Sequence, residues 1–283
     1  MRKYSSEFAL LFVTFIWGFS YILTEVALGQ FETFQIIAVR FLLSTLILGA
    51  VFYKKIFTIE KTDLMYGAAL GLLLIAGYAF QITGQIYTTP AKSAFIIATS
   101  VVIVPFIGTL VYRRRIDTYN IYGAFTALAG VALITFAFDS HINLGDVLTF
   151  VSAIVFAFHL FYTSEFMSRG ADTGSVVTVQ IGVCCLIALI ATLITGQTDF
   201  TNARTDGIMS LLFMAVFATA FCFFVQAWAQ KSINETKAAI ILSMECVFCA
   251  MVSVALGFDI LTLRMFFGAV LILIGVLITE IRD

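Results

Sequence analysis

Charged residues are scarce in this sequence. They make up 12% of its 283 residues, whereas hydrophobic residues make up 61%. Soluble globular domains contain about 25% charged residues, so this composition excludes an ordinary soluble protein. No soluble domain, long linker or low-complexity tract fits between the apolar runs. We therefore expect an all-α integral membrane protein that crosses the membrane many times and is surrounded by lipid.

The sequence also lacks the motifs of several other classes of protein. It has no G-x-x-x-x-G-K-[ST] loop, which excludes a nucleotide-driven pump on this chain. It has no H-E-x-x-H motif, and Glu25, Glu165 and Glu245 lie at different depths of the apolar runs, which argues against a membrane-embedded enzyme. The net charge of −1 gives no support to nucleic-acid binding.

Cysteine is rare too, and every cysteine lies inside an apolar run. These positions indicate neither a disulfide framework nor a redox compartment. Cys246 and Cys249 form a C-x-x-C pair, which in principle ligates a soft metal, but no second pair of ligands accompanies it. Packing of small side chains is the favoured interpretation, and we expect no metal and no cofactor. The cysteines are Cys184, Cys185, Cys222, Cys246 and Cys249.

What the sequence does contain is a series of ten apolar runs. Each has about 20 residues, enough to cross a hydrocarbon core of about 30 Å as a helix. The first run is too long for a secretory signal, and no small-x-small cleavage site follows it, so we expect an uncleaved first span. The runs cover residues 8–28, 33–53, 63–87, 91–112, 119–138, 144–166, 173–195, 208–230, 236–257 and 263–280.

Several landmarks occur twice, 145 residues apart, and Glu25 matches Glu165 at an offset of 140. The offset of 145 residues divides the chain into two copies of five spans. Because five is an odd number, the second copy enters the membrane from the opposite side. We therefore expect two inverted five-helix repeats, residues 1–139 and 140–283. The matched positions are Gln81 and Gln226, Lys92 and Lys237, Gly123 and Gly268, and Gly130 and Gly275.

The distribution of basic residues predicts the orientation, because Lys and Arg concentrate in cytoplasmic loops. If the N-terminus faces the cytoplasm, twelve of the sixteen basic residues fall on the cytoplasmic side. The other side then holds Lys92, Arg204 and Arg264, and Arg40 lies within a span. Both termini are therefore expected to be cytoplasmic.

Two stretches around the matched lysines carry a family resemblance: 85–105, QIYTTPAKSAFIIATSVVIVP, and 226–248, QAWAQKSINETKAAIILSMECVF. They resemble the drug/metabolite transporter superfamily, and the EamA branch most closely. The Gly-x6-Gly pairs of spans five and ten and Arg40 early in span two also resemble that family. The resemblance covers essentially the whole chain.

This resemblance implies a multi-pass carrier of small metabolites in a bacterial inner membrane, often an exporter. It also implies a central cavity between the two halves and alternating access. The family transports amino acids, nucleotide sugars, triose phosphates and drugs, so the resemblance does not choose a substrate.

Glu245 is the strongest candidate for the site. It lies about nine residues, or ~13 Å, from the cytoplasmic end of its span, close to the bilayer midplane, and its repeat counterpart is Ser100. Substrates of inverted-repeat carriers bind at this depth. Loss of water disfavours a charged carboxylate, so Glu245 can hold a substrate amine or a proton. The alternative is a structural hydrogen bond to a helix backbone, or an ion pair with Arg40.

Arg40 and His159 are further candidates for coupling or ion pairing, together with Glu245. Arg40 can contact an anionic substrate, pair structurally or reach toward the outer headgroups. His159 can relay protons near physiological pH, or donate as a neutral ring to a backbone carbonyl.

Other polar and aromatic residues within the spans complete the expected cavity wall. The amides of Gln81 and Gln226 donate and accept hydrogen bonds, which suits a zwitterionic or hydroxylated solute; the alternative is a hydrogen bond between helices. The candidates for substrate binding are Trp17, Tyr21, Tyr78, Gln81, Ser100, His159, Gln226 and Glu245.

Pro105 is the expected hinge, because proline removes a backbone hydrogen bond and kinks a helix. Its repeat counterpart, Ala250, does not, so spans four and nine should bend differently.

The expected function is a secondary active transporter, in the direction of export, for a small polar metabolite such as an amino acid. Coupling to protons is a further expectation. A lipid or drug flippase of the same fold stays open as the alternative, as does, less strongly, a membrane-embedded enzyme. The solute, the direction of transport and the oligomeric state are open, a monomer included.

Overall fold

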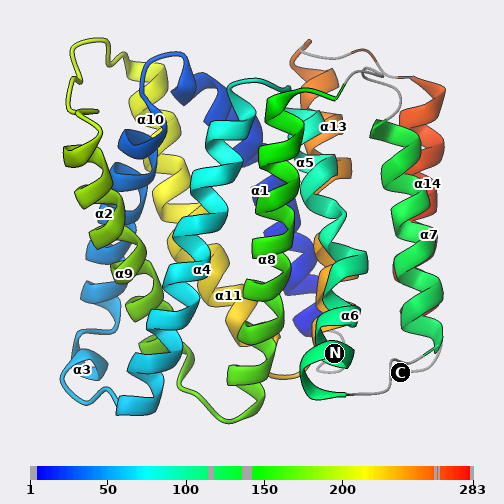
Figure 1. Ribbon diagram of the computed structural model, residues 1–283, viewed down its shortest axis with the longest axis horizontal. Coiled ribbons are helices and arrows are strands. Elements are labelled where there is room, and N and C mark those ends of the chain that lie inside the picture. Colours follow the sequence, from blue (N-terminus) through cyan, green and yellow to red (C-terminus); the bar gives the residue numbers. More distant parts are fainter. Residues whose placement is uncertain (1–4, 114–117, 136–141, 258–259, 261, 281–283) are drawn as a thin grey trace.

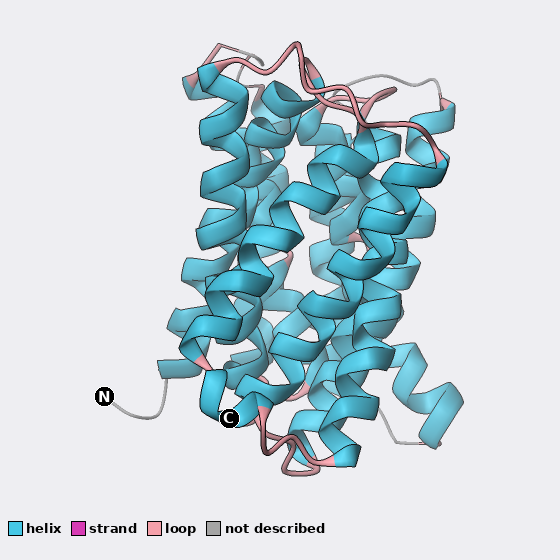
Figure 2. Ribbon diagram, turned by 90° about the vertical axis from the view of Figure 1, so that its left-hand side faces the viewer, coloured by secondary structure: helices cyan, strands magenta, loops and turns pink. Residues whose placement is uncertain are grey.

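The computed structural model describes residues 5–113, 118–135, 142–257, 260 and 262–280. Every regular element in these residues is a helix, and the helices form one upright bundle (Figures 1 and 2). In chain order the helices are α1 (Ser5–Leu28), α2 (Thr33–Val51), α3 (Tyr53–Ile56), α4 (Lys61–Gln85), α5 (Pro90–Ala98), α6 (Ser100–Tyr112), α7 (Thr118–Thr135), α8 (Leu144–Ser168), α9 (Thr173–Ile194), α10 (Thr205–Phe213), the π-helix η1 (Met214–Phe221), α11 (Cys222–Ala229), α12 (Glu235–Leu242), α13 (Glu245–Ala255) and α14 (Leu263–Glu280).

Eight helical stretches in the described part of the chain are long and apolar enough to cross a membrane. They correspond to eight of the ten expected spans, while α7 and the shorter apolar stretch Leu263–Ile278 of α14 occupy the other two places. The outer surface exposes large apolar side chains, such as Phe8, Leu110 and Ile194, as expected of helices that face lipid. The eight stretches are Ser5–Leu28, Thr33–Val51, Lys61–Gln85, Pro90–Tyr112, Leu144–Ser168, Thr173–Ile194, Thr205–Ala229 and Glu235–Ala255.

The bundle has two distinct ends. α1 begins and α14 ends at the same end, which we call the terminal face (Figure 1). The opposite end, where α1 ends and α2 begins, is called the far face. Because successive long helices alternate in direction, α5 and α8 begin on the far face, whereas α12 begins on the terminal face (Figure 1).

Glycines bring the last helix of each expected half into close contact. A Cβ atom on Gly130 of α7 would lie 2.5 Å from the Gly268 carbonyl oxygen, and one on Gly275 of α14 would lie 2.7 Å from the Gly123 carbonyl oxygen. Only glycine fits at so close an approach. These glycines therefore form the contact between spans five and ten.

Spans four and nine are each broken into two helices, at matching positions. Span four breaks at Thr99, between α5 and α6, and span nine breaks at Ser243–Met244, between α12 and α13. At each break a hydroxyl donates to the carbonyl three residues earlier, from Thr99 to Ile96 and from Ser243 to Ile240. Such local hydrogen bonds compete with the helical pattern.

The break in span four does not coincide with Pro105, the expected hinge. A difference in bend between spans four and nine stays a prediction. Pro105 lies inside α6, which continues through it to Tyr112. The break occurs at Thr99 instead, and span nine breaks at the equivalent place although Ala250 stands where span four has Pro105. A proline at this position is therefore not required for a span to break. A movement about Pro105 during function stays a prediction.

Candidate functional site

A cavity of about 80 Å³ lies inside the bundle, enough for a few water molecules. Its wall is formed by residues from helices of both expected halves, among them α1, α2, α4, α8 and α13. All the residues proposed from the sequence for substrate binding or coupling line this one cavity. Their role in binding a solute stays a prediction. They are Trp17, Tyr21, Arg40, Tyr78, Gln81, Ser100, His159, Gln226 and Glu245.

Glu245 reaches the cavity because the span breaks just before it. It is the first residue of α13, so its carboxylate lies at the positive end of a helix dipole. Gly18 of α1 allows the close approach, since a Cβ atom there would lie 2.7 Å from the Glu245 carbonyl oxygen. The Tyr21 hydroxyl donates to Oε1 of Glu245 over 3.3 Å. No basic side chain of the described residues lies within 4 Å of the carboxylate, so the expected alternative of an ion pair with Arg40 is wrong.

Arg40 is buried, with 1% of its surface exposed, so it does not reach toward the headgroups. Its guanidinium donates to the Thr219 hydroxyl, to the Tyr78 hydroxyl over 2.9 Å and to the Ala218 carbonyl oxygen over 3.4 Å. It also lies 4.6 Å from the centre of the Tyr78 ring, in a cation–π contact. Within the described residues no carboxylate lies within 4 Å of it. The cavity therefore contains a cation whose neighbours are all neutral.

The π-helix η1 supplies the acceptors that hold this part of the wall. A π-helix changes the hydrogen-bond register, and such segments are frequent at functional sites. The Ala218 carbonyl oxygen accepts from Trp17 Nε1 over 2.8 Å as well as from Arg40, and the Ala215 carbonyl oxygen accepts from the Ser44 hydroxyl over 2.8 Å. η1 thereby connects α1 and α2 beside the cavity.

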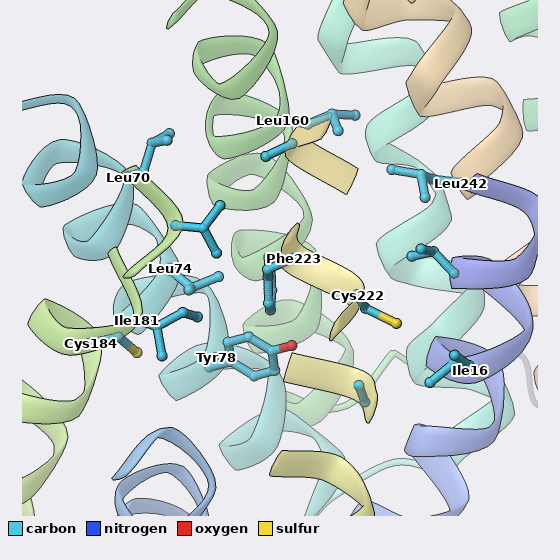
Figure 3. Close-up of a cluster of buried hydrophobic side chains, with 14 of the residues drawn as sticks. Ile16, Leu70, Leu74, Tyr78, Leu160, Ile181, Cys184, Cys222, Phe223 and Leu242 are labelled. Atoms are coloured by element: carbon cyan, nitrogen blue, oxygen red, sulfur yellow. The ribbon is translucent and has the colours of Figure 1, made fainter. Parts of the chain in front are cut away.

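Aromatic rings form much of the remaining wall. The ring of Tyr78 meets those of Phe41, Phe156 and Phe223 edge to face, with centroids 5.3, 5.4 and 6.3 Å away. Figure 3 shows Tyr78 and Phe223 side by side in a cluster of buried apolar side chains that includes Leu74. These contacts restrict the rotamers of Tyr78, so the hydroxyl that accepts from Arg40 is held in place.

His159 contacts Gln180 through its Nε2 atom, 3.3 Å from the Gln180 Oε1 atom, and its ring lies edge-on to Phe223. The side-chain amides of Gln81 and Gln226 line the cavity without a hydrogen-bond partner among the described residues. The alternative interpretation of these two glutamines as hydrogen-bonding links between helices is not found here. Their donors and acceptors are available to a solute.

A model of the EamA-like transporter family matches residues 5–136 and 143–281. The chain belongs to this family. It is an integral, multi-pass membrane protein, as the apolar helices also indicate, and as a transporter it acts on a small-molecule solute. The resemblance described from the sequence is therefore confirmed.

Relatives of this EamA-like transporter extend over its whole length. An uncharacterized transporter of Archaeoglobus fulgidus is 30% identical over 100% of this chain and 88% of the relative. The uncharacterized transporter YoaV of Bacillus subtilis is 20% identical over 94% of each chain. A solved crystal structure superimposes with a TM-score of 0.77, covers 98% of this chain and 97% of the other, and is 14% identical, so the two share a fold.

Several residues of the cavity of this EamA-like transporter were not anticipated from the sequence. Ser20 and Thr24 of α1 line it, as do Phe156 and Phe223, and Thr219 contacts Arg40 from η1. The hydroxyl of Thr219 within an apolar run is the one signal that pointed to it. Nothing in the sequence marks Met214–Phe221 as a π-helix, because its residues suit an ordinary helix equally well.

Proposed function

We propose that this EamA-like transporter is a secondary carrier that binds a small polar metabolite, such as an amino acid, in the cavity between its two halves. One observation carries the proposal. The cavity contains a buried cation, Arg40, and a buried carboxylate, Glu245, and among the described residues each has only neutral partners. Buried charges without a counter-charge are costly, so a function that needs them is the best explanation for their presence.

The two charges suit a zwitterion. The guanidinium of Arg40 would hold a carboxylate, which it can bind with two parallel hydrogen bonds. The carboxylate of Glu245 would hold an ammonium group. The amides of Gln81 and Gln226 would bind further polar groups, and the rings of Trp17 and Tyr78 would contact apolar parts of the solute. His159 and Glu245 are also the groups we propose for coupling to protons.

The architecture we propose has ten spans, arranged as two inverted halves, residues 1–139 and 140–283. Support comes from the family model, which matches two successive segments, 5–136 and 143–281. Further support comes from the matched breaks at Thr99 and Ser243–Met244 and from the reciprocal contacts of Gly130 with Gly268 and of Gly275 with Gly123. Inverted repeats place the binding site at their interface, which is consistent with a cavity lined by both halves.

We propose that the terminal face is cytoplasmic, in a bacterial inner membrane, and that the direction of transport is export. The distribution of basic residues supports the orientation. The far face has Lys92, Arg204 and Arg264. The terminal face has Lys54, Lys55, Lys61, Arg113, Arg169, Lys231 and Lys237.

The cavity volume supports alternating access. At about 80 Å³ the cavity holds a few water molecules rather than a metabolite. We propose that helices or side chains move to admit a solute. Such a movement opens the cavity to one side of the membrane at a time if the two halves rock against each other.

Thermal shift of the purified protein in detergent tests the charge assignment. The ligands are a set of amino acids, the amines that lack their carboxylate and the acids that lack their amine. We expect at least one amino acid to raise the Tm and both of its truncated analogues to fail. Arg40→Gln should remove the response to the amino acid, while Arg204→Gln, an exposed arginine on the far face, should keep it.

Counterflow in liposomes then tests transport of any solute that binds. Glu245→Gln should remove the pH dependence of transport, and an unchanged pH dependence would show that this residue is not the proton site. Stabilisation by lipids or apolar drug cations, with none by any zwitterion, would contradict the proposal and favour a flippase.

A further inference from the structure

An ion pair buried at the far face connects the two halves of the bundle. The Lys92 ammonium, from the first turn of α5, lies 2.7 Å from Oδ2 of Asp146, in the first turn of α8. Their side chains are 8% and 9% exposed. Lys92 belongs to the first half and Asp146 to the second, so the pair must break if the halves separate at this face.

A second ion pair, largely buried, lies at the terminal face. The Lys237 ammonium, from the first turn of α12, lies 3.0 Å from Oε1 of Glu7, in the first turn of α1. These side chains are 6% and 19% exposed. Here the lysine belongs to the second half and the acid to the first, so this pair also crosses between the halves.

The two pairs share their chemistry, and their lysines occupy equivalent positions in the expected repeat. Lys92 and Lys237 are 145 residues apart, and so are Thr89 and Asn234, which precede them. Each of these two side chains accepts a hydrogen bond from the backbone N–H of the following lysine, over 3.3 Å and 2.8 Å. The same local structure therefore places one lysine at each end of the bundle, against the first turn of α8 or α1.

We propose that the Lys92–Asp146 and Lys237–Glu7 ion pairs are the closures of the far and terminal faces, and that one breaks while the other holds during transport. This inference rests on the proposed carrier function. Breaking a buried pair without access to water would leave two uncompensated charges. Opening the face around it lets water reach both groups, so pair breaking and opening occur together.

The two closures differ in the number of hydrogen bonds that the acidic side chain accepts. Asp146 also accepts from the Thr88 hydroxyl over 3.2 Å and from the Asn143 backbone N–H over 3.0 Å. Glu7 has Lys237 as the partner of one oxygen, while its Oε2 atom is buried with no hydrogen-bond partner among the described residues. The terminal closure is therefore the weaker one, and we expect the terminal face to open more often in the absence of solute.

Accessibility of a single cysteine in the cavity tests this inference. The five native cysteines are replaced by alanine. Ser100, which lines the cavity, is then replaced by cysteine. A membrane-impermeant cationic thiol reagent is added to vesicles of either orientation, with no solute present. Lys92→Gln should raise the labelling rate from the far face by about tenfold or more and lower it from the terminal face, and Lys237→Gln should do the reverse.

Matched variants separate the closure from a general loss of structure. The neutral pairs Lys92→Gln/Asp146→Asn and Lys237→Gln/Glu7→Gln remove both charges of each pair and should show the same one-sided opening. Lys92→Arg and Lys237→Arg should label like the parent, as should Lys55→Gln, which breaks an exposed pair at the terminal face. Unchanged labelling in both neutral pairs, or equal increases from both faces, would overturn the inference. Because the assay needs no solute, one-sided opening would stand even if no transported solute were found.

Discussion

The two ends of the bundle are closed by ion pairs of the same kind, but their surroundings differ. Asp146 at the far face has three hydrogen-bonding partners besides the tight packing of α4 on α8. In the part of the chain that the structure describes, Glu7 at the terminal face has one partner and one unsatisfied oxygen. It lines a surface hollow together with Trp228 and Ser232. Repetition of a motif therefore does not make two ends equally stable. A carrier with unequal ends has a preferred resting state.

The largest expected effect comes from removing one lysine at a time. Lys92→Gln leaves Asp146 charged and buried, so it should lower the free energy of unfolding by about 3–5 kcal/mol. Lys237→Gln should cost less, because Glu7 is more exposed and less bound at the start. Thermal unfolding in detergent measures both. Equal losses would remove the proposed difference between the two ends.

A smaller effect is expected when Asp146 loses one hydrogen bond, which makes its surroundings more like those of Glu7. Thr88→Val removes the hydroxyl that donates to Oδ1 of Asp146. A hydrogen bond to a charged group contributes about 1.5–3 kcal/mol, so this variant should be destabilised by that amount. In the Ser100→Cys background, the thiol reagent added from the far face should also label this variant faster than the parent. Thr58→Val, an exposed threonine at the terminal face, is the control and should match the parent.

Packing at the two ends should differ as well. At the far face a Cβ atom on Gly84 would lie 2.5 Å from the Thr149 Oγ1 atom and 2.9 Å from the Gly145 carbonyl oxygen. Gly84→Ala should therefore cost about 1–3 kcal/mol. At the terminal face Ser6→Ala loses a hydrogen bond to Ser232, worth about 0.5–1.5 kcal/mol. A smaller loss for Gly84→Ala than for Ser6→Ala would show that tight packing does not distinguish the far face.

The smallest effect is expected for the exposed pair of Lys55 and Asp172 at the terminal face. Partial burial raises the pKa of Asp172, but hydrogen bonds from Lys55 and Ser175 outweigh it and hold the pKa below its usual range. Asp172 therefore stabilises the fold above the pKa that it has when unfolded, ~3.9, and this contribution disappears as the pH falls through its lower folded pKa.

Lys55→Gln should cost about 0–1 kcal/mol at neutral pH and less in acid, because exposed pairs are weak. Thermal unfolding over a pH series measures it. A loss as large as that of Lys237→Gln would contradict the assignment of the terminal closure to the buried pair.

Much of the cavity was predictable from the sequence, because polar groups within apolar spans are costly and seldom face lipid. Arg40, His159 and Glu245 were identified on that ground, and all three line one cavity. The partners were not predictable. An Arg40–Glu245 pair stayed open as an alternative, whereas Arg40 contacts Thr219, Tyr78 and Ala218 instead. Partner choice depends on how helices distant in the chain are oriented around one another.

The ion pairs, too, were predictable in their lysines but not in their partners. The repeat predicted that Lys92 and Lys237 are equivalent, but both were interpreted only through the distribution of charge between the two faces. Their acids, Asp146 and Glu7, lie 54 and 230 residues away in the chain. No local pattern indicates contacts over such separations.

By itself the sequence determined the membrane environment, the positions of the apolar runs and the internal similarity of segments 145 residues apart, because these follow from hydrophobicity and from comparison of the chain with itself. Tertiary structure decided where spans four and nine break, that η1 is a π-helix, and which charges pair. Those outcomes depend on hydrogen bonds and close contacts between helices. Burial makes each unsatisfied group expensive, so the packed bundle selects the partners that the linear sequence leaves open.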